Sequence, residues 1–426
     1  MAMTGPGSWI FSPRQIGADV TEDQIARPAR LDWRTRILLY GYGFFDGLIL
    51  IYPVYLLYFR DQGLSETEIA TLLMLWPISS LLFELPSGYL ADRFSKKTIL
   101  VVGHVAYLGC FAVWHVLPTF TGFGIGLALW GMRGALSSGA FRSFLYEEME
   151  ARGTRNAFVR VLGQINALKW TAMLVAYSVG PALMTFGFTL VLALTATAAV
   201  IALAALLLVE RKASPVADDD TAGFGGFFRA LNSHVLREPS VLRVVLFGGA
   251  LLGTGAVDEY WPLLGTDLGV PETALGLFLG AIMGAQALGD LLAHRLAAQR
   301  PLFVGAAVAG AGALLLFGVA FGTLYVALPA VVVFAMLYQC AVTANSGLLH
   351  DRVEGSVRAT AASILGFASN IISILLFYAI GQISERAGVP IAIACAGGVF
   401  LAIGLAGIRM EQKAGRLAGE RGGKDA

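Results

Sequence analysis

The chain has 426 residues, of which 57% are apolar and 14% charged, and its net charge is +1. A soluble protein carries about 25% charged residues, so this composition excludes an ordinary soluble globular protein. The near-zero net charge and the confinement of aromatic residues to apolar runs argue against nucleic-acid binding. Cys110, Cys340 and Cys395 form no CxxC pair and lie near no His cluster, so we expect neither a metal nor a cofactor.

The N-terminal segment, residues 1–35, has no apolar core of the length that a secretory signal needs. From residue 36 onward, apolar runs of about 20 residues, enough to cross a bilayer as a helix, alternate with charged loops. They predict twelve transmembrane helices, at 36–58, 66–90, 98–118, 121–146, 158–183, 186–209, 241–264, 272–296, 301–320, 323–348, 357–384 and 389–408.

A charged linker over 210–240 divides these spans into two halves, 36–209 and 241–408, and a tail follows at 409–426. Within the linker, Phe227, Phe228, Leu231 and Val235 share one helical face, which predicts a short helix lying on the cytoplasmic leaflet or packed on the protein. We therefore expect an all-α membrane protein, built from two similar six-helix bundles around a central cavity.

Basic residues predict the orientation of the chain in the membrane. With the N-terminus inside, 25 of the 30 Lys and Arg residues fall in cytoplasmic segments or at their edges, whereas external loops hold Arg60 and Arg386. The remaining three, Arg133, Arg142 and Lys169, lie within spans. We expect a multi-pass protein of the plasma (inner) membrane with both termini in the cytoplasm, working as a monomer in the lipid bilayer.

The two halves repeat in sequence. The segment after the first span and the segment after the seventh share four residues at a constant offset of 206: Asp61, Gly63, Glu66 and Thr67 recur as Asp267, Gly269, Glu272 and Thr273. Two further sets recur in the same order at offsets of 202 and 203. Repeated halves are typical of secondary transporters, and the even number of spans between matching points makes this repeat parallel.

Polar residues recur at depth in every third span. Spans one, four, seven and ten contain Asp46, Arg133, the pair Asp258 and Glu259, and the set Gln339, Thr343 and Asn345. A charge at the bilayer centre costs about 2.5–3.5 kcal/mol, so these spans predict a central wet cavity. Spans three, six, nine and twelve lack Asp, Glu, Lys and Arg in their apolar stretches, so they are expected to face lipid.

This plan of two similar six-span halves resembles the major facilitator superfamily over about 36–408. The strongest local resemblance is the segment GYLADRFSKK from Gly88 to Lys97, which looks like the family's GxxxDRxGRK signature with a serine and a lysine substituted. Pro53-Val54 and Gly180-Pro181 are similar to parts of the motifs of its drug:proton antiporter branch. The resemblance implies a transporter that alternates access to a midplane site.

The signature loop predicts a gate at the cytoplasmic side. There, helix N-termini and Arg358 could stabilise the carboxylate of Asp92 and latch the two halves together. Alternatively, the basic residues of the loop only enforce topology. The candidate gate residues are Gly88, Asp92, Arg93, Lys97, Glu147 and Arg358.

Asp46, halfway through span one, is the first candidate for a proton site, because a carboxylate that loses water can take up and release a proton. Tyr42, Ile49 and Pro53 share its face in a continuous helix. The alternative is a permanent Asp46–Arg133 ion pair that only fixes packing.

Asp258 and Glu259 are further candidates for proton coupling. As neighbours on a helix they point about 100° apart, so one is expected to face the cavity and the other a neighbouring helix. Alternatively, both are solvated residues at the outer mouth. Candidates for the substrate cavity are Tyr42, Arg133, Lys169, Trp170, Tyr260, Gln339 and Asn345.

These observations favour a proton-coupled exporter of small amphiphilic molecules. The first alternative is a symporter importing a small anionic metabolite, held by Arg133 and Lys169. A membrane-embedded enzyme needs a clustered catalytic set at one membrane face, and the isolated His104 and His115 and the acidic run at 218–220 form none. We therefore expect a transporter with a small-molecule substrate and protons as its partners, and no enzyme.

The orientation yields a direct test of topology. A cysteine introduced at Ala217, in the linker, is expected to resist an impermeant thiol reagent in intact cells and to react once the cells are permeabilised. Labelling in intact cells would overturn the predicted arrangement.

Overall fold

A computed structural model describes residues 31–137, 139–212, 239–297, 301–321, 323–352 and 358–422, and helices lie at all twelve predicted positions. Within these ranges, nine segments are long and apolar enough to cross a membrane unaided. The elements in chain order are α1 (Trp33–Gly47), η2 (Tyr52–Val54), α2 (Tyr55–Asp61), α3 (Glu66–Arg93), α4 (Lys96–Val116), α5 (Phe120–Ser137), α6 (Ala140–Ala151), η3 (Arg155–Ala157), α7 (Phe158–Met184), α8 (Phe188–Leu208), α10 (Pro239–Thr254), η5 (Gly255–Tyr260), α11 (Trp261–Asp267), α12 (Glu272–Ala297), α13 (Pro301–Ala320), α14 (Leu324–Arg352), α15 (Arg358–Ala387) and α16 (Val389–Gly422).

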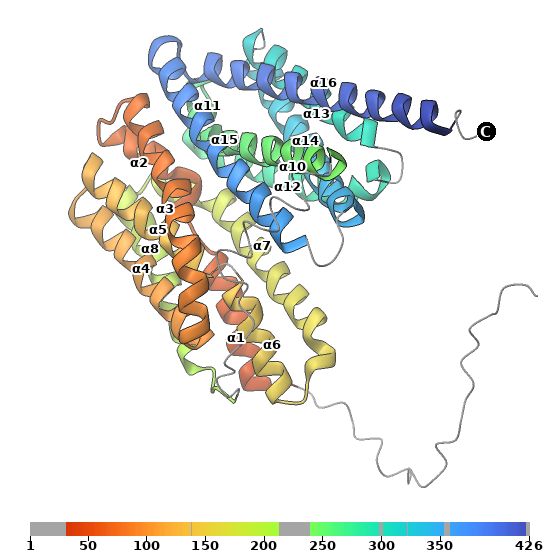
Figure 1. The fold of residues 1–426 in the computed structure, drawn as a ribbon. Coiled ribbons are helices and arrows are strands. Elements are labelled where there is room, and N and C mark those ends of the chain that lie inside the picture. The colour runs from red at the N-terminus through yellow and green to blue at the C-terminus, as the bar shows by residue number, and fades with distance from the viewer. Residues whose placement is uncertain are drawn as a thin grey trace, which may run out of the picture.

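The helices form two groups, α1 to α8 and α10 to α16, seen side by side in Figure 1. Two seams join them: α3 packs against α15, and α7 packs against α12. The chain is thus an all-helical, multi-pass membrane protein. The helix expected in the linker lies outside the described residues.

The sequence repeat has a matching backbone. Gly63 and Gly269 have φ angles of 85° and 86°, and both accept this left-handed conformation without the penalty a side chain brings. Gly63 N donates to Arg60 O at 3.0 Å, and Gly269 N donates to Thr266 O at 2.9 Å, so both residues end a helix with the same turn. The repeat noted in the sequence therefore corresponds to equivalent structure at these turns.

The first span is broken, which corrects the expectation of a continuous helix over 36–58. α1 ends at Gly47, and the chain turns through η2, which begins at Tyr52 with Pro53 in its first turn, before α2 starts. Ile51 N, freed from helical bonding, donates to Thr195 Oγ1 on α8 at 3.0 Å. Because buried backbone groups need partners in a membrane, Thr195 stabilises the break.

The seventh span is broken at the corresponding place. η5 separates α10 from α11, and Pro262 lies in the first turn of α11. Two hydroxyls stabilise the end of α10, since Tyr338 Oη donates to Leu251 O at 3.0 Å and Ser373 Oγ donates to Gly253 O at 3.0 Å. Discontinuous helices at matching points of two repeats are where transporter sites form.

Spans four and twelve also differ from prediction. Gly139, with a φ of 76°, separates α5 from α6, so the expected helix over 121–146 is interrupted. The last helix, predicted to stop at residue 408, continues as α16 to Gly422. Its final part is rich in Arg, Glu, Gln, Lys, Ala and Leu, whose high helix propensity offsets its glycines beyond the apolar stretch.

At the end of the molecule bearing Asp61, predicted to be external, polar contacts close the two halves. Arg60 donates to Glu66 in its own half at 2.7 Å and to Asp267 in the other half at 2.6 Å. Thr67 N donates to Glu385 Oε2 at 3.2 Å. We call the Arg60–Asp267 and Thr67–Glu385 contacts the outer clasp.

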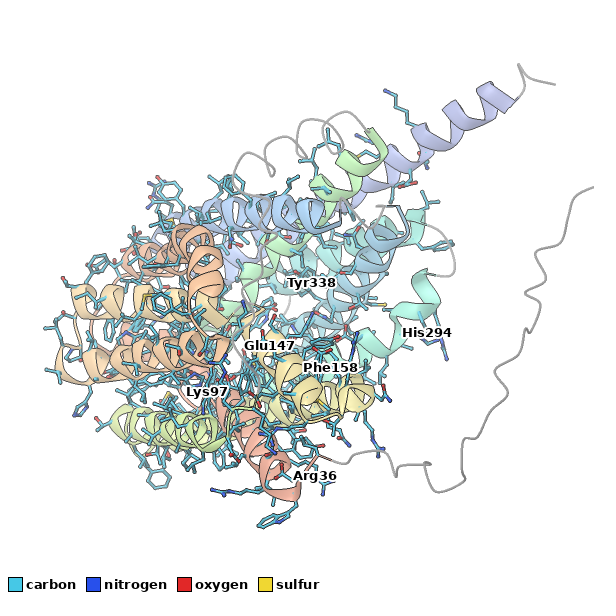
Figure 2. The ribbon with its side chains drawn as sticks, turned by 60° about the horizontal axis from the view of Figure 1, so that its bottom comes forward. Arg36, Lys97, Glu147, Phe158, His294 and Tyr338 are labelled. Atoms are coloured by element: carbon cyan, nitrogen blue, oxygen red, sulfur yellow. The ribbon has the colours of Figure 1, made fainter. Side chains whose placement is uncertain are left out.

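The opposite end is seen in Figure 2, which labels Arg36, Lys97 and Glu147 there. Lys97 Nζ donates to the carbonyl oxygens of Leu207 and Val209, at 2.8 and 2.7 Å, and so caps the C-terminus of α8. These bonds tie Lys97 to its own half.

Charged groups at this end also hold the segments before α1 and after α8. Asp32 caps α1 by accepting from Thr35 N at 2.8 Å, and this backbone hydrogen bond lowers the pKa of Asp32. The fully buried Glu148 accepts from Lys212 N at 3.0 Å. The N-terminal half is therefore fastened at both of its chain ends.

The outer clasp predicts the effect of removing Arg60. An exposed ion pair contributes about 0–1 kcal/mol, so Arg60→Gln is expected to raise the open-to-closed ratio at this end by up to roughly fivefold. Spin labels at Gln62 and Thr273, on either side of the clasp, should then report a longer mean distance. Glu68→Gln is the matched control, because Glu68 bonds Ser65 within its own turn. Equal distances in both variants would contradict a holding role for the clasp.

Candidate functional site

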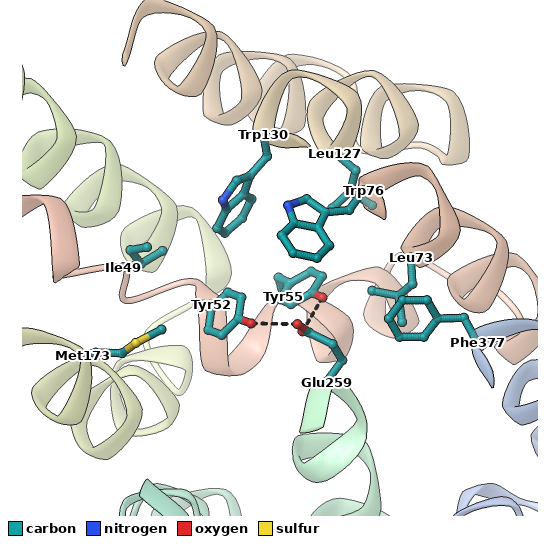
Figure 3. Close-up of a pocket in the computed structure, with 10 residues that line it drawn as sticks. All are labelled: Ile49, Tyr52, Tyr55, Leu73, Trp76, Leu127, Trp130, Met173, Glu259 and Phe377. Atoms are coloured by element: carbon teal, nitrogen blue, oxygen red, sulfur yellow. Dashed lines mark hydrogen bonds between the residues drawn. The ribbon is translucent and has the colours of Figure 1, made fainter. Parts of the chain in front are cut away.

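A cavity of about 190 Å³ lies where the two broken spans meet, and Figure 3 shows its lining. The lining comes from both halves and is largely aromatic and apolar. It consists of Ile49, Tyr52, Tyr55, Leu73, Trp76, Leu127, Trp130, Met173, Glu259 and Phe377. Glu259 is the one ionisable carboxylate in this lining.

Glu259 is bonded across the interface between the halves. Its two carboxylate oxygens accept from Tyr52 Oη and Tyr55 Oη, each at 2.6 Å (Figure 3). With Glu259 ionised, these are charge-assisted hydrogen bonds, stronger than those between neutral groups. Glu259 thus joins η5 to the break in the first span, and does so beside the empty volume of the cavity.

Asp258 points elsewhere, as expected for neighbouring positions. It accepts from Trp261 Nε1 at 3.0 Å and from Gln286 Nε2 on α12 at 2.9 Å. Glu259 therefore faces the cavity and Asp258 faces a neighbouring helix, which is the first of the two expected arrangements. The alternative, in which both lie at a solvated mouth, does not describe the geometry.

A second polar site, the buried charge cluster, lies within the N-terminal half and consists of Asp46, His104, Arg133 and Lys169. Asp46 Oδ1 contacts Arg133 Nη2 and lies 3.2 Å from His104 Nε2, while Asp46 Oδ2 accepts from Lys169 Nζ at 2.8 Å. The cluster joins α1, α4, α5 and α7. Two basic side chains, Arg133 and Lys169, therefore share one carboxylate.

Exposure differs sharply within the buried charge cluster. Asp46 and His104 are 5% and 0% exposed, whereas the side chain of Lys169 is 49% exposed. The guanidinium of Arg133 lies 4.1 Å from the centre of the Tyr107 ring, a cation–π contact that stabilises its buried charge. Lys169 is thus the member of the cluster with open access to the surroundings.

Two glycines of α1 allow this approach. A side chain at Gly43 would meet Ile165 on α7, and one at Gly47 would lie 2.5 Å from the Lys169 carbonyl oxygen. Their absence of side chains lets α1 and α7 pack backbone to backbone. That contact places Lys169 beside Asp46.

Asp46 contacts Arg133, the pair that the alternative interpretation named, and the proton-carrying role of Asp46 stays a prediction. The expected continuation of its face is wrong for Ile49 and Pro53, because α1 ends at Gly47. Tyr42 packs on His104, with ring centres 5.4 Å apart, and not in the cavity lining.

Other predicted cavity residues are dispersed. Trp170 is 63% exposed on α7, and Tyr260 is fully buried against Phe377. Gln339 donates to Asp290 at 2.9 Å, and Asn345 is buried where α14 meets α10, next to Gly248. None of these four lies in the lining of the cavity.

Several site residues were missed in the sequence. His104 lies in the span expected to face lipid, and Asp290, which pairs with Gln339 and Thr343, had no motif to mark it. The tyrosines Tyr52 and Tyr55 flank Pro53, so a proline within a span was the available signal for a break.

The predicted cytoplasmic latch remains a prediction. Gly88, Asp92, Arg93 and Arg358 lie outside the described side chains, and Glu147 is placed on α6. In the described part of the chain, no group of three or more His, Cys, Asp or Glu residues is arranged to hold a metal ion.

Comparison with known proteins supplies the family. The sequence matches the model of the Major Facilitator Superfamily over residues 11–171 and 165–377. A curated relative, the uncharacterized MFS-type transporter YfkF of Bacillus subtilis (strain 168), is 28% identical over 109 residues. That match covers 25% of this chain and spans only 27% of the relative's length.

Solved structures share the fold at low sequence identity. The nucleoside transporter NupG has a TM-score of 0.70 at 14% identity, covering 88% of this chain and 98% of its own. The D-xylose-proton symporter has a TM-score of 0.67 at 15% identity, covering 88% and 94%. A bacterial homologue of the human lysosomal transporter Spinster, in an inward-facing and occupied conformation, has a TM-score of 0.67 at 14% identity, covering 89% and 96%.

The buried charge cluster predicts a large cost for neutralising Asp46. Asp46→Asn leaves Arg133 and Lys169 without their counter-charge, and breaking a buried pair costs about 3–5 kcal/mol. The variant should therefore melt at a clearly lower temperature in detergent, and Asp46→Asn/Arg133→Gln should recover part of the loss. Asp290→Asn is the matched control, because its partners Gln339 and Thr343 are neutral. Equal melting of the two single variants would refute the structural role of the pair.

Proposed function

The chain belongs to the major facilitator superfamily and is a membrane transporter, and we propose that it is a proton-coupled exporter of small amphiphilic molecules. The observation that carries this proposal is the cavity between the halves, lined by aromatic and apolar side chains together with the carboxylate of Glu259. We further propose that it works as a monomer in the plasma (inner) membrane, with both termini in the cytoplasm.

The lining supports a substrate with an apolar body and a positively charged group. Aromatic faces attract cations through their negative π surface, and Trp76, Trp130, Tyr52 and Tyr55 present such rings. A carboxylate adds a charged partner in a poorly solvated place. The volume of about 190 Å³ lies below the roughly 300–1,000 Å³ of drug-sized sites, so we expect a small substrate or one that protrudes.

The position of Glu259 supports a link between binding and movement. A substrate cation that pairs with Glu259 competes with Tyr52 and Tyr55 for the same carboxylate oxygens. Since those tyrosines belong to the other half, binding would weaken a contact between the halves. Rocking about the α3–α15 and α7–α12 seams would then open the site alternately to each side.

We assign the coupling proton first to Asp46, with Asp258 and Glu259 as the alternatives. Asp46 connects the four helices of the buried charge cluster, so a change in its charge reaches most of the N-terminal half. Glu259 has only hydroxyl partners in its hydrogen bonds. Among the described residues, no basic side chain forms an ion pair with its ionised form.

A second candidate function is import of a small anionic metabolite with a proton. The observation that favours it is the half-exposed ammonium of Lys169. Arg133, buried and paired with Asp46, is not free to share this role in the present conformation. Similar folds include a nucleoside transporter and a D-xylose-proton symporter, which support transport of a polar molecule together with a proton as the alternative.

Transport by purified protein in liposomes tests the proposal. With an imposed pH gradient, we expect accumulation of a small aromatic cation, benzyltrimethylammonium, against its gradient, in exchange for protons. Glu259→Gln should lower that accumulation at least tenfold, because the cation loses its counter-charge. Glu272→Gln, an exposed carboxylate at the start of α12, is the matched control and should stay within twofold of wild type.

The opposite result is equally specific. Accumulation of benzoate together with protons, lost in Lys169→Gln and retained in Glu259→Gln, would reject the exporter and establish the second candidate. The direction of transport is determined in the same vesicles. The orientation of the protein in them follows from the accessibility of the cysteine introduced at Ala217.

A further inference from the structure

His104 is a buried titratable residue in the centre of the N-terminal half. It lies on α4, is 0% exposed, and packs against the ring of Tyr42 on α1. Its Nδ1 lies 3.0 Å from Leu100 O, and its Nε2 lies 3.2 Å from Asp46 Oδ1. Each ring nitrogen therefore lies near one oxygen atom, but Nε2, although 3.2 Å from Asp46 Oδ1, is a buried atom without a hydrogen-bond partner in this arrangement.

These two contacts restrict where the protons of His104 lie, and we assign the tautomer with a hydrogen on Nδ1. A backbone carbonyl only accepts hydrogen bonds, so Nδ1 must carry a hydrogen to bond Leu100 O. In a neutral imidazole Nε2 then has a lone pair, which would face the lone pairs of an ionised Asp46. The contact becomes attractive only when one further proton lies between Nε2 and Oδ1, carried by either atom.

The surroundings of His104 come from every helix of the buried charge cluster. Arg133 on α5 and Lys169 on α7 bond the same carboxylate, and the phenols of Tyr42 on α1 and Tyr107 on α4 flank His104 and Arg133. With a neutral His104 and an ionised Asp46, the cluster has a net charge of +1. The shared proton raises the net charge of the cluster to +2. The N-terminal half therefore has two charge states, one with this proton and one without it.

Access to this proton is indirect. His104 has no exposed surface, whereas Lys169, on the other oxygen of Asp46, is half-exposed. On release, the Nε2–H bond breaks with its electron pair left on nitrogen. The proton forms a bond with Asp46 Oδ1, and solvent water that enters from the side of Lys169 would take it from that same oxygen.

We propose that the coupling proton is shared between His104 and Asp46, which makes His104 the proton-binding residue of the transporter. This inference rests on the proposed proton coupling and replaces a lone Asp46 with a pair. Loss of the proton leaves two acceptors facing one another between α4 and α1, and their repulsion favours separation of the two helices. Because α1 leads into η2 and Tyr52, the change reaches the hydrogen bond to Glu259.

The central test is His104→Gln in the full chain. The glutamine amide reaches the position of Nε2 and donates to Asp46 but cannot exchange a proton. We expect binding of benzyltrimethylammonium and its downhill exchange to stay within twofold of wild type. Accumulation driven by a pH gradient should fall at least tenfold. His115→Gln, on the exposed face at the other end of α4, is the matched control and should accumulate normally.

A spectroscopic measurement does not depend on transport. Nitrogen NMR of ¹⁵N-histidine protein in nanodiscs, with the His104 signals assigned by their loss in His104→Gln, should show a hydrogen on Nδ1 and a strongly hydrogen-bonded Nε2. The Nε2 signal should change in Asp46→Asn. A hydrogen on Nε2 alone, with the same signals in both proteins, would overturn the shared proton.

The outcomes separate this inference from the proposed function. If the wild-type protein does not accumulate substrate in response to a pH gradient, the proposed proton coupling is overturned. If the wild-type protein does respond and the His104→Gln variant accumulates substrate equally well, only the role of His104 is overturned.

Discussion

The N-terminal half depends on one buried carboxylate. Asp46 is removed from water yet faces Arg133, Lys169 and His104, and no single helix could hold these charges in a membrane without the others. The close approach of α1 and α7 at Gly47 is required for the contact with Lys169. The close packing at Gly47 brings Lys169 to Asp46, and the ion pairs of Asp46 in turn hold α1 against its neighbours. Both contacts lie at the last two residues of α1, where the helix ends.

That end point determines the geometry of the cavity. In a continuous first span, Tyr52 and Tyr55 would lie on the surface of one straight helix. The turn through η2 instead brings both hydroxyls to Glu259. The broken seventh span supplies Glu259 from the other half in the same way. Each break is stabilised by side-chain hydroxyls from neighbouring helices, so the irregular backbone is held by its own half while its polar side chains meet across the interface.

Much of this arrangement was predictable from sequence, because bilayer thickness and the cost of buried charge act on local patterns. Run lengths predicted where helices lie, and the repeat that includes Gly63 and Gly269 corresponds to two equivalent turns. The Asp46–Arg133 pair was foreseen as one of two alternatives. His104 was not, because its role depends on which helix packs beside α1, and single spans contain no signal for that neighbour. The break at Pro53 was missed because a run of apolar residues continues through it.

The outer clasp also contains information about how the two halves diverged. In the repeat, Asp267 corresponds to Asp61, but Arg60 corresponds to Thr266. Two identical halves related by an axis along the membrane normal would form such a contact twice, once on each side of the axis. Arginine is present in one copy only, so closure at this end is driven from one side of the molecule. The two halves are therefore unequal at this end: Arg60 of the N-terminal half donates to Asp267 of the C-terminal half, whereas Thr266, at the matching position, bonds within its own helix.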